Sequence, residues 1–380
     1  MYSVRCGAVL FVLFSCACDD GIDDPEPDNA TLFDERRIDT SVVRTPSFAV
    51  EEVDGVAWAA VGAQIVRVPA AGKAVTILQG LRVHGALAHD ASYVYFASQS
   101  ARYGIAPYES KMHVGGGHLD DGAIYRARRD GTGSPEKLVD VGVLVGAFAL
   151  TGGHLYVCES PGLNADGDVL DVTLTGTPSA SRITMRMNEY CEGVVADEKN
   201  LYLAMNASHK TLISGDSIVE FPRTIELARV SRDADTSAIA IDGPPRFATT
   251  AIEPGFDGMF LDDEGIALTT GDKVVRYGLD GASKPAPQLS SGSDLVAPHG
   301  PDWLEASSGS QTNTKDDSCH GGRVWLSHAG ERRELTQAVC TPRAFGGSSF
   351  LWFVETADLT APGCCETYGR LRLKRLDLPR

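Results

Sequence analysis

Four side chains of the kinds that ligate metals or exchange protons stand at the same point of a repeated motif. They are His84, Glu192, Asp257 and His299, and each directly precedes a glycine. Imidazole and carboxylate groups bind divalent cations and also serve as general acids and bases. If the fold gathers these four side chains, they could hold a divalent metal ion or bind a cationic or polar ligand.

The glycine opens a segment that recurs along the chain. "HGALAHDASYVYFAS" from His84 is matched by "VGAFALTGGHLYVCE" and "EGVVADEKNLYLAMN", and more loosely by copies further along, for seven in all. Each copy has the pattern of a strand, a tight turn and a second strand. A second module follows, as in "GAIYRARRDGTGSPEKLV", where the Asp-Gly pair predicts a hairpin because glycine tolerates a positive φ.

Seven copies of a four-strand unit predict an all-β fold, a seven-bladed β-propeller of four-stranded antiparallel blades over residues 36–380. The last copy, "YGRLRLKRLDLPR", stops after its third strand. We expect the β-prone segment 36–45, "RRIDTSVVRT", to complete that last blade and close the ring, since an open sheet edge favours aggregation.

In a propeller the first strand of each blade lines the central channel. His84, Glu192, Asp257 and His299 are therefore expected at the channel mouth as ligand-binding residues and as a metal-ligand set. Arg246 and Arg343, just upstream of two copies, are expected to reach the same face. The alternative is that these residues are solvated and line a water-filled channel. A one-residue error in the alignment would also turn the side chains elsewhere.

The repeats resemble those of secreted bacterial propellers of the TolB-like and NHL/YVTN-like kind, especially lipoproteins. The similarity covers roughly residues 36 to 380 and rests on "LAHDASYVYFAS" followed by "GAIYRARRDGTGSPEKLV". It implies a fold rather than an activity, because propellers host binding, scaffolding and catalysis alike. Some NHL-like propellers are metal-dependent lyases, but their motif does not transfer residue by residue to this chain.

The N-terminus has the features of a lipoprotein export signal over residues 1–18. A short apolar run follows Arg5, and "LFSC" resembles a lipobox that would make Cys16 the lipidated residue, with Cys18 as a rival. An ordinary signal peptide is the alternative. Residues 19–35, which begin "DDGIDDPEPDNA", are acidic and poor in apolar residues, and we expect a flexible tether.

Six further cysteines are expected to form disulfides in an exported chain. We predict the pairs Cys158–Cys191 and Cys319–Cys340, each closing a short loop, with Cys364 and Cys365 bonded to each other or free. The cysteine spacings do not match a zinc ribbon.

Two loops offer weaker candidate sites. The insertion "ARYGIAPYESKMHVGGGHLDDG" contains His113, His118, Asp120 and Asp121, which could bind a metal or could simply belong to a mobile surface loop. "NADGDVLD", residues 164–171, is similar to a calcium loop but lacks the required glycine and distal glutamate, so we interpret it as a turn.

The net charge of −17 disfavours nucleic acid as a partner, because like charges repel. The chain contains no Gly-x-Ser-x-Gly elbow and no phosphate loop. We therefore expect a monomeric, non-catalytic, lipid-anchored propeller, periplasmic or at the cell surface, that binds an envelope protein or glycan or acts as a scaffold. No cofactor is certain and a divalent metal ion is the one candidate. The alternative is a metal-dependent lyase or hydrolase acting at the channel mouth.

Overall fold

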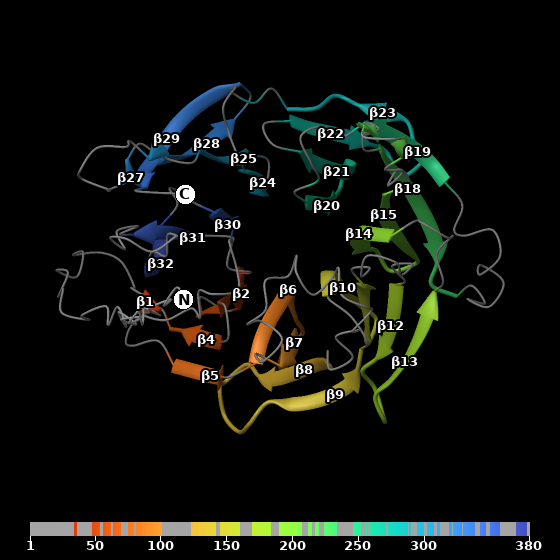
Figure 1. The fold of residues 1–380 in the computed structure, drawn as a ribbon, viewed down its shortest axis with the longest axis vertical. Helices are drawn as coiled ribbons and strands as arrows, with labels where there is room; N and C mark the ends of the chain where they lie inside the picture. Colours follow the sequence, from red (N-terminus) through yellow and green to blue (C-terminus); the bar gives the residue numbers. More distant parts are fainter. Residues whose placement is uncertain are drawn as a thin grey trace, which may run out of the picture.

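A ring of antiparallel sheets surrounds a central axis (Figure 1). This computed structural model describes residues 34–35 and then 48–377 with gaps, the longest of which are 101–122, 160–168, 234–245 and 358–369. Within those ranges every regular element is a strand, so no helix there is long and apolar enough to cross a membrane. The molecule is a β-propeller.

Six blades are each formed by one contiguous stretch of the chain. Blade 1 contains β2 (Phe48–Val53), β3 (Val56–Val61), β4 (Gln64–Val68) and β5 (Val75–Gln79). Blade 2 contains β6 (Leu81–His89), β7 (Tyr93–Ser100), β8 (Ala123–Arg128) and β9 (Glu136–Asp140). Blade 3 contains β10 (Val145–Thr151), β11 (His154–Glu159), β12 (Val169–Thr173) and β13 (Ser179–Ile183).

The next three blades follow the same order from the axis outward. Blade 4 contains β14 (Tyr190–Ala196), β15 (Asn200–Asn206), β18 (Thr224–Ser231) and β19 (Arg246–Ala251). Blade 5 contains β20 (Gly258–Asp262), β21 (Gly265–Thr270), β22 (Lys273–Tyr277) and β23 (Ser283–Lys284). Blade 6 contains β24 (Leu295–His299), β25 (Asp302–Ser307), β28 (Gly322–His328) and β29 (Glu331–Ala338).

The prediction of seven equivalent four-stranded blades is wrong. Six blades are formed by contiguous stretches of the chain. They have three to four strands each, since the outer strand β23 of blade 5 has only two residues. The last repeat supplies only three strands of its own, β30 (Arg343–Gly346), β31 (Phe350–Ala357) and β32 (Arg370–Asp377), and we call this composite unit the closing sheet. Its fourth strand, β1 (Asp34–Glu35), comes from the other end of the chain.

The closing strand is also not the predicted one. Asp34 pairs with Arg372 and Glu35 with Leu371, so the strand falls at the end of the segment expected to be a tether. Residues 36–45 lie outside the described residues. The sequence of β32, "RLRLKRLD", is basic, and opposite charges favour cross-strand pairing with an acidic segment. The opposite charges of β1 and β32 therefore favour the observed pairing.

The first strands of blades 1 to 5 contact one another around the axis (Figure 1). Blade 6 contacts blade 5 through β24 and β21, and β30 contacts both β24 and β2. The hairpins between first and second strands, and between third and fourth, all lie at one end of the ring, which we call the turn face. The other connections lie at the opposite end, the loop face. Two of these carry extra hairpins, β16 (Leu212–Ser214) with β17 (Ser217–Val219), and β26 (Ser310–Gln311) with β27 (Cys319–His320).

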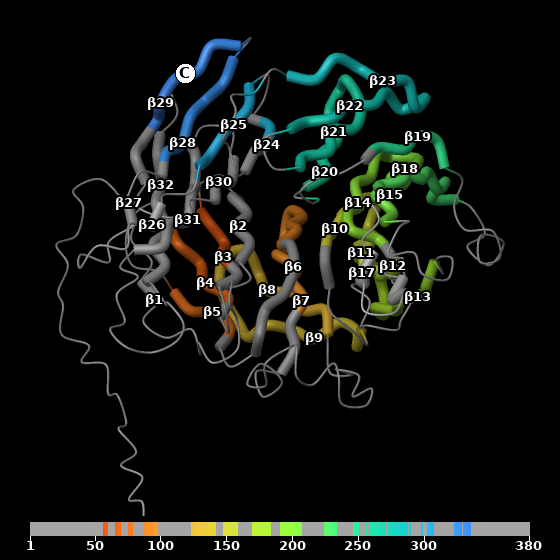
Figure 2. The backbone as a smooth tube through the Cα atoms, turned by 45° about the horizontal axis from the view of Figure 1, so that its top comes forward, coloured from red at the N-terminus to blue at the C-terminus, as the bar shows by residue number. Residues whose placement is uncertain are grey.

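The hydrophobic core is divided into layers between neighbouring blades. Trp58 and Ile65 of blade 1 pack with Leu87 and Phe96 of blade 2, and similar clusters join each later pair of blades up to blades 5 and 6. Because each blade is covered on both flat faces, the interfaces between blades are apolar and the blades are fixed relative to their neighbours. Figure 2 shows the ring of sheets turned by 45° from the view of Figure 1.

An aspartate fixes the first hairpin of blades 2, 4 and 5. In Asp90, Asp197 and Asp262, Oδ1 accepts hydrogen bonds from two backbone N–H groups of the turn at 2.6–3.1 Å. In blades 2 and 4 the other oxygen accepts the hydroxyl of a tyrosine five residues on, Tyr95 at 2.5 Å and Tyr202 at 2.8 Å. These bonds hold the turn face rigidly to the core.

The two partners in blade 4 shift each other's pKa. Burial raises the pKa of Tyr202 to about 12, and its hydrogen bond to Asp197 acts in the same direction. Burial would raise the pKa of Asp197, but hydrogen bonds from the backbone of Lys199 and Asn200 and from Tyr202 outweigh it and lower that pKa below its usual value. The bonded pair is therefore an ionised carboxylate with a neutral phenol.

Stability should fall at high pH because of this tyrosine. An unfolded tyrosine has a pKa of about 10. The folded pKa of Tyr202 is higher, so its contribution is complete below pH ~10 and is lost as the pH rises through about 12. We expect the urea midpoint to fall over this window, and to fall less in Tyr202→Phe. An equal loss in wild type and Tyr202→Phe would contradict this role for the Asp197–Tyr202 bond.

Candidate functional site

The predicted channel-mouth residues do not all reach one face. Glu192 is near the start of β14, and Asp257 directly precedes β20 and lies outside the described residues. His84 lies within β6 and pairs with Ala97, on the loop-face side of the hairpin. Arg343 begins β30. The first strands β6, β14 and β30 thus carry His84, Glu192 and Arg343 toward the loop face.

His299 and Arg246 lie elsewhere. His299 ends β24 opposite Asp302, so it belongs to the turn face, and Gly300 follows the strand instead of opening it. The alignment was wrong there because it matched the letters "HG", whereas Pro301 cannot donate a ladder hydrogen bond and favours a turn. Arg246 begins the outer strand β19, where its Nε donates to Glu226 at 2.9 Å. The structure does not bring these two residues to the channel mouth.

Glu192 is the one member of the proposed metal set whose side chain the structure describes. Its Oε1 accepts a hydrogen bond from Nδ2 of Asn206 at 2.6 Å, and Asn206 is fully buried. In the described part of the chain, no three His, Cys, Asp or Glu side chains are grouped as metal ligands. The insertion with His113, His118, Asp120 and Asp121 falls outside it, as does most of 164–171. Asp171 is on β12, 2.7 Å from His154 Nδ1.

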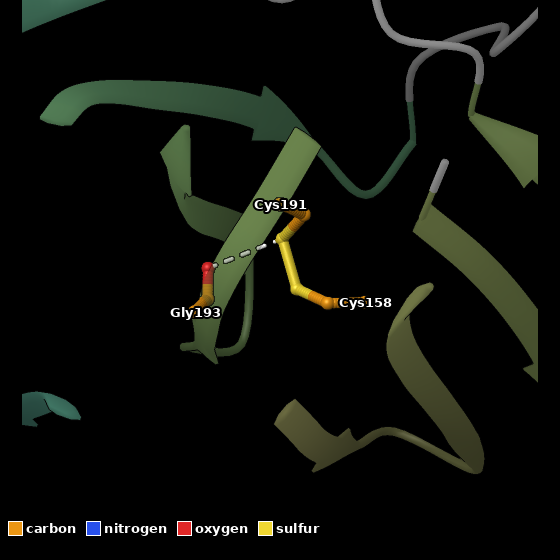
Figure 3. The surroundings of a disulfide bond; sticks show 3 residues. All are labelled: Cys158, Cys191 and Gly193. Carbon is orange, nitrogen blue, oxygen red and sulfur yellow. Dashed lines mark hydrogen bonds between the residues drawn. A yellow bond between two sulfur atoms is a disulfide. The ribbon is translucent and has the colours of Figure 1, made fainter. Parts of the chain in front are cut away.

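The predicted disulfide Cys158–Cys191 is confirmed (Figure 3). Cys158 is on β11 of blade 3 and Cys191 is on β14 of blade 4, so the bond links two blades through their buried interface. Cys319 is on β27, and its pairing with Cys340 stays a prediction, because Cys340, Cys364 and Cys365 lie outside the described residues.

The repeat glycine next to this disulfide has the packing role expected of it. A Cβ added to Gly193 would lie 2.7 Å from Cζ of Phe256 and 3.1 Å from Cβ of Met259, both near the start of blade 5. Real carbon atoms do not approach so closely without displacement of the neighbour. Glycine at this position therefore lets blade 5 pack against the first strand of blade 4.

A cleft of about 490 Å³ lies at the turn face between blades 1 and 2. Blade 1 contributes Val56 and Arg67 at the ends of β3 and β4. Blade 2 contributes its first hairpin and the end of β8. The residues that line the cleft from blade 2 are Ala91, Ser92, Tyr93, Arg128, Arg129 and Asp130. Only Val56 and Ala91 are apolar, so the cleft offers hydrogen-bonding and charged groups to a ligand.

The arginines of the cleft are held in different ways. Nη1 of Arg129 donates to the carbonyl of Asp90 at 2.9 Å. Arg128 is largely exposed, and its Nε is 3.7 Å from Asp130. Arg67 packs its stem on the Asp-Gly turn of blade 2, where a Cβ added to Gly131 would lie 3.1 Å from Cδ of Arg67. Gly131 has the positive φ, +77°, that the Asp-Gly pair predicted.

The equivalent interface between blades 3 and 4 is filled. There Arg232 occupies the place of Arg129 at the end of the third strand. It donates to the carbonyls of Glu198 at 2.6 Å and Thr151 at 3.3 Å, and to the hydroxyl of Tyr156 at 3.4 Å. Thr151 and Tyr156 belong to blade 3, so Arg232 joins the two blades. The cleft between blades 1 and 2 is thus a departure from the repeat.

Sequence reasoning missed this cleft. "IVRV" and "YRARRDG" were interpreted only as strands with a turn, although both place arginine at the end of a third strand. The shared position of these arginines was the signal in the sequence that could have indicated a basic site. The inter-blade contact that brings Arg67 to Arg128 and Arg129 is not visible in either segment.

No known protein family matches the sequence, and no curated protein matches it as a relative. Solved structures are similar in fold. A chain in a crystal structure of the mitotic checkpoint complex has a TM-score of 0.53 at 11% identity, covering 100% of both chains. The polysaccharide lyase Uly1 has a TM-score of 0.50 at 10% identity, over 87% of this chain and 90% of that one.

YCF48 bound to a D1 peptide is less similar, with a TM-score of 0.44 at 8% identity over 93% of this chain and 97% of that one. At such identities these likenesses bear on the fold alone. The β-propeller fold of this chain is shown by its own sheets.

Proposed function

We propose that the protein is a non-catalytic, ligand-binding β-propeller, exported and held at the bacterial envelope by a lipid anchor. The observation that carries the binding role is the polar cleft between blades 1 and 2. Its walls come from two blades joined by an apolar layer, and the Asp90–Tyr95 bond fixes one of its turns. A preformed polar cleft on a rigid scaffold loses little entropy on binding, which favours affinity. The ligand would be a glycan or protein of the envelope.

Support for export comes from the N-terminal sequence and from Cys158–Cys191. Disulfides persist in oxidising compartments and are rare where thiols are kept reduced. The lipobox-like "LFSC" would attach the anchor at Cys16, and the acidic segment after it would separate the propeller from the membrane.

The anchor is tested by labelling cells that express the full chain with an alkyne fatty acid. We expect wild type and Cys18→Ser to incorporate the label and to sediment with membranes, and Cys16→Ser to lose both properties. The variants differ by the same chemical change two residues apart, so each is the other's control. Label on Cys16→Ser but not on Cys18→Ser would move the anchor to Cys18, and no label on wild type would remove it.

The binding role is tested by blocking the cleft. Ala91 is exposed in the first turn of blade 2, and Glu198 is the exposed residue at the same position in blade 4. We expect a panel of envelope glycans and charged and neutral monosaccharides to contain a ligand that raises the melting temperature of wild type and of Glu198→Trp, but not of Ala91→Trp. A ligand that binds Ala91→Trp as tightly as wild type would place the site elsewhere.

A further inference from the structure

We infer that the cleft between blades 1 and 2 binds its ligand through an oxyanion, a carboxylate, sulfate or phosphate group carried on a small molecule or a glycan unit. This inference rests on the proposed function and names the ligand chemistry of the same site. It rests on the arginines that the two blades bring together, and on the hydrogen bonds and charges of the groups beside them.

The cleft has a local excess of positive charge. Its lining contains three guanidinium groups, on Arg67, Arg128 and Arg129, and one carboxylate, on Asp130. Arginine stays charged at all physiological pH values, so this excess does not titrate away. The whole chain has a net charge of −17, so the charge of the cleft is opposite in sign to that of the chain as a whole. Guanidinium groups bind planar oxyanions with paired, charge-assisted hydrogen bonds.

The one carboxylate in the cleft lining, on Asp130, already accepts hydrogen bonds from its own turn. Oδ1 of Asp130 accepts hydrogen bonds from the backbone N–H of Thr132 at 2.8 Å and from its hydroxyl at 2.7 Å. These bonds, followed by the nearby charges of Arg128 and Arg67, lower the pKa of Asp130, so it remains ionised. Asp130 mainly stabilises its own turn through these hydrogen bonds, and its negative charge offsets only one of the three arginine charges in the cleft.

Arg67 provides an unused hydrogen-bond donor. Among the atoms that the structure describes, Nε of Arg67 is buried and has no hydrogen-bond partner. A buried N–H group of a charged side chain is costly to leave unsatisfied. A ligand oxygen that entered beside this atom could satisfy it, as the hydroxyl of Tyr156 satisfies Nε of Arg232 between blades 3 and 4.

The size and surroundings favour a small oxyanion over a polyanion. A volume of about 490 Å³ is in the range of small-molecule sites. Tyr93 lines the cleft, and the guanidinium of Arg126, which is paired with Glu136 at 2.8 Å, lies 4.4 Å from its ring centroid. The negative charge of the rest of the chain would repel a long polyanion such as nucleic acid.

The test uses four sugars that share one ring: glucose, glucuronate, glucose 6-sulfate and glucose 6-phosphate. Titration calorimetry at low salt should show at least one charged sugar binding at least about tenfold more tightly than glucose. Arg67→Gln and Arg128→Gln should each weaken that binding about tenfold. Arg182→Gln, which removes an exposed arginine from β13 in blade 3, should leave it unchanged. Raising the salt concentration should weaken binding to wild type.

The outcomes separate this inference from the proposed function. The tightest of the three charged sugars identifies the oxyanion. Glucose binding as tightly as all three would overturn the inference and leave the cleft a binding site. The same holds if a ligand lost in Ala91→Trp is retained in Arg67→Gln and Arg128→Gln. Failure of every sugar and of the whole panel to bind wild type would overturn both.

Discussion

Replacing Cys158 and Cys191 with alanine should lower the free energy of unfolding by about 3–4 kcal/mol. The two residues are separated by 33 positions, and releasing a loop of that length restores chain entropy to the unfolded state on this scale. The bond also joins β11 of blade 3 to β14 of blade 4 within a buried layer, so its loss loosens an interface between blades. Urea denaturation followed by fluorescence measures the change.

Wild type unfolded in the presence of dithiothreitol is the control. Its urea midpoint should fall at least as far as that of the double variant. Any response of the variant's own midpoint to the reductant would report the second predicted disulfide, Cys319–Cys340. A double variant as stable as oxidised wild type would show that the layer between blades 3 and 4, and not the covalent bond, holds these blades together.

Replacing Arg332 with methionine should destabilise the protein by about 3 kcal/mol. Glu305 of β25 is fully buried, and Nη2 of Arg332 lies 3.3 Å from its Oε2. Ser327 donates to the other carboxylate oxygen, and the guanidinium lies 3.4 Å from the ring centroid of Trp325. Removing the arginine takes from the buried carboxylate the countercharge that Arg332 supplies, and such a loss costs more than the ion pair contributes. The urea midpoint of Arg332→Met reports the loss.

The companion variant distinguishes the ion pair from simple packing. Arg332→Met combined with Glu305→Leu removes both charges, and buried pairs replaced by apolar residues are often close to neutral. We expect the double variant to recover most of the stability lost in Arg332→Met. If it is less stable than Arg332→Met, the carboxylate has a favourable role of its own, and the explanation through an uncompensated charge is wrong.

The β-propeller fold could be predicted because its signals are local. Alternating apolar residues and Asp-Gly turns each act within one hairpin, and the structure confirms them in turns such as that of Gly131. The disulfide could be predicted because only 33 positions separate its cysteines, and closing a chain segment of that length costs little entropy. The strand pairing that closes the ring was harder to predict, since β1 has only two residues and its partner β32 lies at the other end of the chain.

The sites were harder to predict because they depend on how blades meet. The match of "HG" at His299 predicted a position at the channel mouth, whereas His299 lies at the turn face. A motif of two letters does not show which end of a strand it occupies. The cleft was missed for a related reason. Arg67 belongs to blade 1 and Arg128 to blade 2, and no local pattern links them.

The sequence alone determined the repeating strands, the tight turns between them and the positions of chemically capable side chains, because these follow from backbone preferences within a few residues. Only the tertiary structure decided which strands close the ring, which residues share a face and where a gap remains between blades. Those features depend on the packing of whole sheets, in which side chains distant in the sequence compete for the same space. Arg232 fills such a space between blades 3 and 4, whereas the corresponding space beside Arg129, between blades 1 and 2, forms the cleft.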